Sequence, residues 1–176
     1  TATDTTTATP TDTATPTPTP NPYACNATPA PTLCVQPSSQ GAFIGDTVTI
    51  DVAVDGVNDL GGYALSLSWD PSVLDFVSVT NGPFLGSSGR TVSCNGPFPG
   101  TGTFDFTCVT LGAELAGASG TGLLATVKLA AVGPGLSPVA VGASTLVNPL
   151  GANIAIGSMR HGSVLVDVPP TPTVTL

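Results

Sequence analysis

The chain has 176 residues, only 8% of them charged, and eleven acidic residues against three Lys and Arg give a formal net charge of −8. A nucleic-acid binder needs a basic footprint that releases counterions from phosphate, and an anionic membrane surface attracts the same kind of footprint. Arg90, Lys128 and Arg160 are too few to form one. We therefore exclude nucleic acid as a partner, and the charge argues against binding to an anionic membrane.

The composition favours an all-β fold. Gly (21) and Pro (18) are abundant, and they interrupt helices and form turns, while Val and Thr suit pleated strands. The longest apolar run, residues 122–132, contains Lys128 and is much shorter than the ~20 residues of a membrane helix. We expect no membrane insertion. The sequence starts without Met or a signal peptide, so we expect a processed mature form or a fragment.

Residues 1–32 are of low complexity, and the first twenty contain only Thr, Ala, Pro and Asp. Regular Pro favours extended polyproline II geometry, so twenty residues would reach on the order of 60 Å. Two interpretations of this N-terminal tail stay open, an O-glycosylated stalk and a bare flexible spacer. The O-glycosylation candidates are Thr9, Thr11, Thr13, Thr15, Thr17 and Thr19. Asn26 begins an N-glycosylation sequon, Asn-Ala-Thr, which is followed by Pro29.

The four cysteines, Cys25, Cys34, Cys94 and Cys108, allow three disulfide pairings. Proximity in sequence favours Cys25–Cys34 and Cys94–Cys108, and the second pair would staple a hairpin. A metal site would need close C-x-x-C pairs or nearby histidines, whereas this chain has one histidine and no such pair. We therefore expect disulfides, and with them an extracellular or cell-surface location.

Residues 33–168 alternate between short apolar runs and turn signals, which predicts about nine strands in two facing antiparallel sheets. Residues 47–55 alternate strictly, with Val48, Ile50, Val52 and Val54 on one face. The other predicted strands are residues 33–36, 63–69, 73–80, 91–94, 103–110, 123–132, 137–147 and 162–168, and residues 114–118 are predicted to form one helical turn.

After residue 168 the composition returns to Pro and Thr. We therefore divide the chain into an N-terminal tail (1–32), a β-sandwich (33–168) and a C-terminal tail (169–176). The last four residues, Thr173, Val174, Thr175 and Leu176, alternate and are a candidate segment for adding a strand to a neighbouring sheet.

Four segments resemble the cohesin family in matching order. They are GDTVTIDV (45–52), LGGYALSLSWDPSVLDFVSV (60–79), TGLLATVKL (121–129) and HGSVLV (161–166). The resemblance implies a nine-strand jelly roll that has no catalytic residues and serves as a scaffold receptor for dockerin modules; related carbohydrate-binding modules share the fold. Trp69 replaces the usual Tyr, the hairpin with Cys94 and Cys108 looks like an insertion, and the chain contains no dockerin-type calcium loop.

The sequence offers no set of catalytic residues, and we expect neither an enzyme nor a cofactor. His161 is the only histidine, and we interpret it as a surface residue. Asp70 and Asp75 are a possible carboxylate pair, but Asp70 precedes Pro71 and is expected to cap a turn.

Two kinds of ligand site, for calcium and for a sugar, have candidate residues in the sequence. Asp55, Asn58 and Asp59 are a weak calcium candidate, because Asp and Asn in a loop near Gly usually form a turn. Sugar stacking needs several coplanar exposed aromatic rings. Trp69 is in phase with buried positions, whereas Phe84 and Phe98 fall in Gly/Pro loops and are the candidates for exposure.

The leading functional hypothesis is a non-catalytic extracellular structural or adhesive module, which self-associates into a fibre or surface array through its tails and sandwich edges. Two alternatives remain, a cohesin-type scaffold receptor for a dockerin-like partner and a carbohydrate-binding module that binds polysaccharide. The expected partners are therefore copies of the chain itself, a dockerin-like protein or a polysaccharide.

Overall fold

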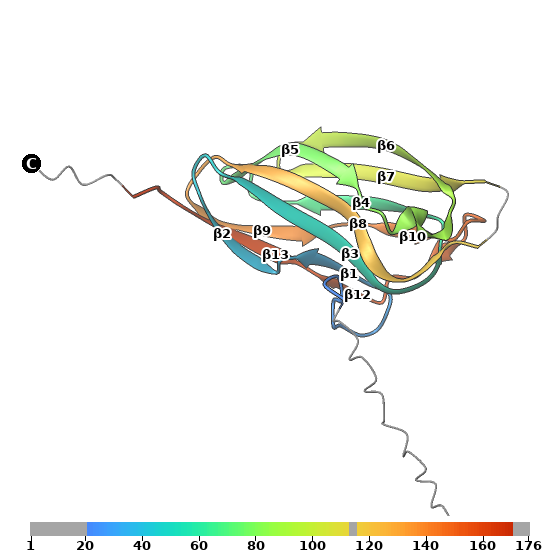
Figure 1. Ribbon diagram of the computed structural model, residues 1–176. Coiled ribbons are helices and arrows are strands. Elements are labelled where there is room, and N and C mark those ends of the chain that lie inside the picture. The colour runs from blue at the N-terminus through green and yellow to red at the C-terminus, as the bar shows by residue number, and fades with distance from the viewer. Residues whose placement is uncertain (1–20, 113–115, 171–176) are drawn as a thin grey trace, which may run out of the picture.

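The computed structural model describes residues 21–112 and 116–170. Its strands form two sheets packed face to face (Figure 1). The all-β, two-sheet sandwich predicted from the sequence is confirmed. A single turn of 3-10 helix, η1 (Leu85–Ser88), follows β5. The O-glycosylation candidates Thr9 to Thr19, part of the expected helical turn and the candidate segment Thr173 to Leu176 lie outside the described residues.

One sheet has five strands in the order β12-β1-β3-β8-β5. Their bounds are β1 (Thr32–Gln36), β3 (Thr47–Leu60), β5 (Leu74–Asn81), β8 (Ala118–Ala131) and β12 (Ser158–Arg160). The two long strands β3 and β8 pair along most of their length and form the middle of this sheet (Figure 1).

The second sheet has eight strands. Their bounds are β2 (Ser39–Phe43), β4 (Gly62–Ser68), β6 (Thr91–Gly100), β7 (Thr103–Leu111), β9 (Gly135–Val141), β10 (Thr145–Val147), β11 (Asn153–Ile154) and β13 (Gly162–Asp167). β4 pairs with β7 on one side and with β9 and β10 on the other. β6 continues the sheet beyond β7, and β13 and β2 continue it beyond β9.

The core lies between the sheets and follows from the alternation. In β3, Val48, Ile50, Val52 and Val54 are buried, as their spacing predicts. Other strands contribute further buried side chains at the same spacing: Leu65 and Leu67 from β4 and Phe104 and Phe106 from β7 in the facing sheet, and Val127 and Leu129 from β8 beside β3. This apolar burial is the main force that holds the two sheets together.

Four short strands were not predicted as separate elements. β2 (SQGAF) and β12 (SMR) carry no strong alternation and pair in the parallel sense, β2 with β13 and β12 with β1. β10 and β11 are three and two residues long. β6 also runs further than predicted, through Pro97 and Pro99, with a register shift between Asn95 and Phe98. It is an outer strand of the sheet, where a missing N–H is tolerated.

All four cysteines are paired, as Cys25–Cys34 and Cys94–Cys108. Cys94 and Cys108 are directly opposite residues of β6 and β7, so their disulfide crosses the hairpin. Cys25 lies ahead of β1, and its bond to Cys34 fastens the preceding segment to the sandwich.

Candidate functional site

The outer face of β4 and β7 is the best candidate for a binding site. The side chains of β4 that point away from the core are all small: Gly62, Ala64, Ser66 and Ser68. In register beside them on β7 lie the outward residues Thr103, Asp105, Thr107 and Val109, followed by Leu111. We call these nine residues the β4–β7 face.

Gly62 sets the shape at one end of the β4–β7 face. It lies opposite Val109 on β7 and Val147 on β10. A Cβ at position 62 would lie 3.1 Å from Val109 Cγ1 and 3.2 Å from Val147 Cγ2, so a larger residue would have to displace these two valines slightly. The result is a shelf of small residues with aliphatic side chains at one end.

The β4–β7 face is apolar at that end and nearly uncharged. Leu111 is 53% exposed and Val109 is 40% exposed, and both are aliphatic side chains. Asp105 is the only charged residue among the nine, and it lies opposite Phe98 of β6, which is 55% exposed. Low charge and exposed apolar groups at the centre of a patch are typical of protein-binding surfaces.

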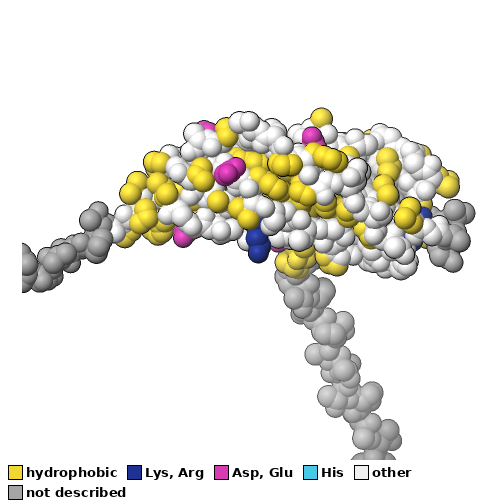
Figure 2. Space-filling model, turned by 90° about the horizontal axis from the view of Figure 1, so that it is seen from above, with side chains coloured by type: hydrophobic (Ala, Val, Ile, Leu, Met, Phe, Trp, Pro, Cys, Tyr) yellow, Lys and Arg dark blue, Asp and Glu magenta, His cyan; other side chains and the backbone are white. Residues whose placement is uncertain are grey.

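The outer face of the five-stranded sheet has a different character. Thr47, Thr49 and Asp51 of β3 face the solvent beside Thr126 and Lys128 of β8. The Thr126 hydroxyl donates a hydrogen bond of 2.7 Å to the Asp51 carboxylate. Figure 2 shows the molecule from above, with few and scattered charged side chains and a band of hydrophobic ones. The β4–β7 face differs from this outer face in its row of small residues on β4, beside which Val109 and Leu111 are exposed.

The calcium candidates, expected in a loop, lie in β3 and bind neighbouring segments through hydrogen bonds. The Asp55 carboxylate accepts hydrogen bonds from the Cys25 backbone N–H, at 2.9 Å, and from the Thr121 hydroxyl. Asp59 accepts one of 2.7 Å from the Gly117 N–H, and the Asn58 side-chain oxygen accepts one from Ser119. Within the described ranges no group of three or more His, Cys, Asp and Glu residues could hold a metal ion. These oxygens therefore join the end of β3 to β8 and to the segments that precede β1 and β8.

The aromatic side chains are mostly internal. Trp69 is buried, and its indole N–H donates to the Leu74 carbonyl at 2.9 Å. Phe84 was a candidate for exposure on sequence grounds, and that prediction is wrong. It is 8% exposed, because its ring packs against Gly122, where a Cβ would lie 2.5 Å from Phe84 Cδ2. Phe98 is exposed, but a single ring does not form a stacking platform.

The carboxylates weighed for catalysis have structural partners. Ser72 donates to Asp70 Oδ1 through its hydroxyl (2.6 Å) and its N–H (2.9 Å), and these bonds lower the pKa of Asp70 below its usual value. Asp75 accepts from the Phe76 N–H. His161 Nδ1 accepts from the Val141 N–H at 3.1 Å.

Among the residues that the structure describes, no helix is long and apolar enough to cross a membrane.

Sequence reasoning missed Val109 and Leu111. The signal was present, because the outward positions of residues 103–111 read Thr, Asp, Thr, Val and Leu. Two solvent-facing aliphatic residues in succession after polar ones indicate a surface patch, but only the register with Gly62 and Ala64 shows that the patch borders a shelf.

Comparisons with known proteins agree on one family. The family model for the cohesin domain matches residues 35–145. A comparison with curated proteins gave no significant match. Among solved structures, a non-cellulosomal cohesin from the archaeon Archaeoglobus fulgidus is similar at a TM-score of 0.61 and 18% identity, with 77% of this chain and 90% of that chain covered.

Two further similar structures are bacterial cohesins of both types. A type II cohesin domain from the cellulosome of Acetivibrio cellulolyticus has a TM-score of 0.63 and 17% identity, covering 77% of this chain and 95% of that one. A type I cohesin–dockerin complex from Clostridium thermocellum has a TM-score of 0.62 and 17% identity, covering 80% and 97%. With a family model that matches more than half of its length and a sandwich of the same fold, the chain belongs to the cohesin family.

Proposed function

We propose that this protein is a non-catalytic receptor module that binds a dockerin-like partner on its β4–β7 face. Membership of the cohesin family supports the proposal, and several similar structures are cohesins in complex with dockerins. The observation that carries the site assignment is the pairing of a small-residue shelf with the exposed aliphatic residues Val109 and Leu111.

The chemistry of the β4–β7 face suits a helical partner. Small residues on β4 let the backbone of a docking helix approach the sheet closely, while Val109 and Leu111 offer apolar contacts near one end. The Ser and Thr hydroxyls on the remainder of the face can donate or accept hydrogen bonds at little desolvation cost. With Asp105 as its only charge, this face would select partners by shape and hydrogen bonding more than by electrostatic attraction.

An extracellular location is part of the same proposal. Two disulfides are typical of proteins that fold in an oxidising compartment. Asn26 is exposed on the loop between the paired Cys25 and Cys34, which is compatible with glycosylation of its sequon. We propose that residues 1–20 and 171–176 act as linkers, with Thr9 to Thr19 as the sites for O-glycans.

Affinity measurements with site variants test the proposal. The wild-type chain is titrated by calorimetry with a panel of purified dockerin modules of both types, and at least one is expected to bind with micromolar affinity or better. Val109→Asp and Leu111→Asp should each weaken that binding about 100-fold, because each places a carboxylate against an apolar contact.

Thr49→Asp is the matched control. It introduces the same carboxylate at an exposed strand position on the other sheet, directly opposite Lys128. It should leave the affinity unchanged, and circular dichroism verifies that all three variants are folded. Equal loss of binding by Thr49→Asp and Leu111→Asp would refute the site assignment, and no binding to any dockerin would refute the partner class.

Self-association is a second candidate, and the edge of the sheet at β2 favours it. β2 ends the eight-stranded sheet, and its sequence, SQGAF, contains no Lys or Pro that would guard an edge. Analytical ultracentrifugation of residues 1–176 and 21–170, with Gly41→Lys as a variant, tests it. A concentration-dependent assembly that Gly41→Lys disrupts would support it, and a monomer at all concentrations would reject it.

A further inference from the structure

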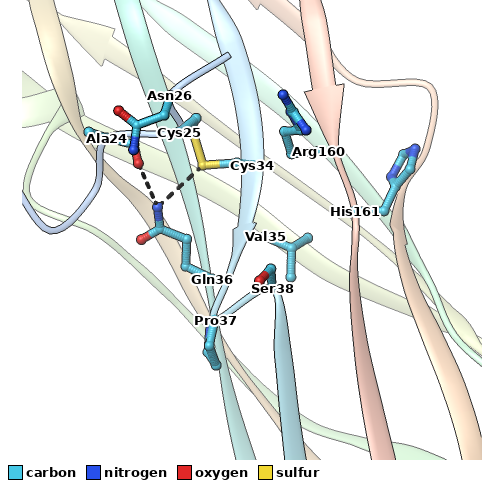
Figure 3. A pocket seen from close by; sticks show the side chains of 10 residues that line it. All are labelled: Ala24, Cys25, Asn26, Cys34, Val35, Gln36, Pro37, Ser38, Arg160 and His161. Carbon is cyan, nitrogen blue, oxygen red and sulfur yellow. Dashed lines mark hydrogen bonds between the residues drawn. A yellow bond between two sulfur atoms is a disulfide. The ribbon is translucent and has the colours of Figure 1, made fainter.

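A pocket of about 480 Å³ shares no lining residue with the β4–β7 face, and Figure 3 shows the side chains that line it. It is formed where the chain crosses from β1 to β2, between the Cys25–Cys34 loop and the junction of β12 and β13. Its size falls within the range of about 300–1,000 Å³ found for small-molecule sites. Neither the fold nor the proposed partner accounts for it.

One of the few cations of this acidic protein lines the pocket. The chain has three Lys and Arg residues in total. Arg160 is one of them, and none of the residues that line the pocket is acidic. The parallel pairing of β12 with β1 sets the backbone of Arg160 beside Cys34. Two carboxylates lie next to the lining residues, and both have hydrogen-bond partners. Asp51, opposite Gln36, accepts from the Thr126 hydroxyl, and Asp55 accepts from the Cys25 N–H.

Uncharged hydrogen-bonding groups surround the cation. Asn26 and Ser38 are exposed and line the pocket together with Arg160 (Figure 3). The Gln36 amide N–H donates to the Ala24 carbonyl at 3.3 Å, and also to the Cys34 sulfur, which leaves its carbonyl oxygen as an acceptor. His161 Nδ1 accepts from Val141, so in the neutral ring the proton is on Nε2, which is a donor.

We infer that this pocket binds an acidic saccharide, with the Arg160 guanidinium on the carboxylate of a uronic acid and Gln36 and Ser38 on its hydroxyls. An arginine offers paired N–H donors that match a carboxylate. A mixture of neutral donors and acceptors around the cation suits a polyhydroxylated ligand more than a simple anion. The inference does not depend on the dockerin-like partner, because the two sites share no residue.

The test is an NMR titration of ¹⁵N-labelled protein, expressed in a host that does not glycosylate Asn26. Trigalacturonic acid is the probe, a neutral trisaccharide of galactose is the comparison ligand, and a tripeptide of aspartate represents acidic peptides. We expect trigalacturonic acid to shift the amide signals of residues 24–38 and 160–161, and the neutral trisaccharide to shift them at least tenfold more weakly.

Two variants that each lose one positive charge distinguish binding in the pocket from a general electrostatic attraction of the acidic saccharide to the protein. Arg160→Gln should weaken binding of trigalacturonic acid about tenfold, which is the usual scale for one charge-assisted contact. Lys128→Gln removes a cation from the exposed face of β8 and should have no effect. The dispersion of each spectrum shows whether the variant is folded.

Three results would overturn the inference. The first is that no amide signal shifts at tens of millimolar trigalacturonic acid. The second is that Arg160→Gln and Lys128→Gln weaken the binding of trigalacturonic acid equally. The third is that the aspartate tripeptide binds as tightly as trigalacturonic acid. The last would mean that the pocket recognises carboxylates without regard to the sugar. None of these results bears on the dockerin titration, so the two proposals fail independently.

Discussion

At the residue scale, Tyr63 connects the two sheets through its hydroxyl. Its ring is buried in the core, and its hydroxyl lies 2.8 Å from both the Asn81 side-chain oxygen and the Leu124 carbonyl. Leu124 also accepts from the Gly82 N–H. Tyr63→Phe removes the hydroxyl and leaves Asn81 without this donor, so we expect it to lower the free energy of unfolding by about 1–2 kcal/mol.

Urea denaturation measures this loss, and Tyr23→Phe is the control. Tyr23 is the only other tyrosine and lies in the segment ahead of β1, where removal of a hydroxyl should change the stability little. A Tyr63→Phe protein as stable as the wild type would show that the hydroxyl has no net stabilising role.

Burial also raises the pKa of the Tyr63 phenol above its usual value. The unfolded chain then ionises this group from about pH 10, while the folded protein keeps it neutral. The stability that depends on the neutral phenol is thus complete below pH 10 and falls as the pH rises above it. We expect denaturation midpoints between pH 9 and 11 to fall less in Tyr63→Phe than in the wild type, and identical profiles would contradict this.

The Asp70 carboxyl should make the stability depend on pH in the acid range, where stability is lost as the pH falls. The Ser72 hydroxyl, and then the Ser72 N–H, lower the pKa of this carboxyl. Its contribution is complete above the unfolded pKa of about 3.9 and is lost as the pH falls through the lower folded value. Asp70→Asn keeps an accepting oxygen but cannot titrate, so thermal melting between pH 5 and 2 should depend less on pH than in the wild type. An unchanged pH dependence would exclude this role.

The sequence predicted the role of Asp70 but not the burial of Phe84. An Asp before Pro forms its hydrogen bonds with its own local backbone, so the sequence contains the whole interaction. Phe84 is buried through Gly122, which is distant in the chain and leaves space for the ring. A contact of this kind depends on the packing of β8, and no local sequence pattern around residue 84 indicates it.

At the scale of elements, the two disulfides stabilise different parts of the molecule. Cys94–Cys108 closes the β6–β7 hairpin over 14 residues, and Cys25–Cys34 fastens the N-terminal segment over 9. The chain-entropy model gives about 3 kcal/mol for each loop. We expect the double variants Cys94→Ala/Cys108→Ala and Cys25→Ala/Cys34→Ala each to lose a similar free energy of unfolding, measured by guanidinium denaturation. A loss below about 1 kcal/mol for either pair would contradict the model for that loop.

Long strands were predicted from the sequence, and short edge strands were not. β3 and β8 alternate over many residues because one face is buried along their whole length. β2 and β12 have weak patterns and exist because β13 and β1 offer them backbone partners. The segment of residues 21–31, expected to belong to the tail, is tied to β3 by the Cys25–Asp55 hydrogen bond. We propose that the domain begins near residue 21.

At the scale of the whole molecule, the two outer faces of the sandwich differ in chemistry. The sequence shows which residues alternate outward, but it does not show which outward residues share a surface, because the partners of β4 come from distant segments. Val109, Gly62 and Val147 meet only after β7, β4 and β10 have paired. For that reason the fold could be predicted from the sequence, whereas the β4–β7 face required the structure.

The most direct test of the β4–β7 face is a methyl NMR spectrum of the protein with and without a bound dockerin module. Val77 of β5 is 51% exposed on the other sheet and provides an internal reference with methyl groups of the same kind. We predict that the methyl signals of Val109 and Leu111 shift or broaden in the complex while those of Val77 do not change. Shifts at Val77 with unchanged signals from Val109 and Leu111 would contradict the account and place the partner on the five-stranded sheet.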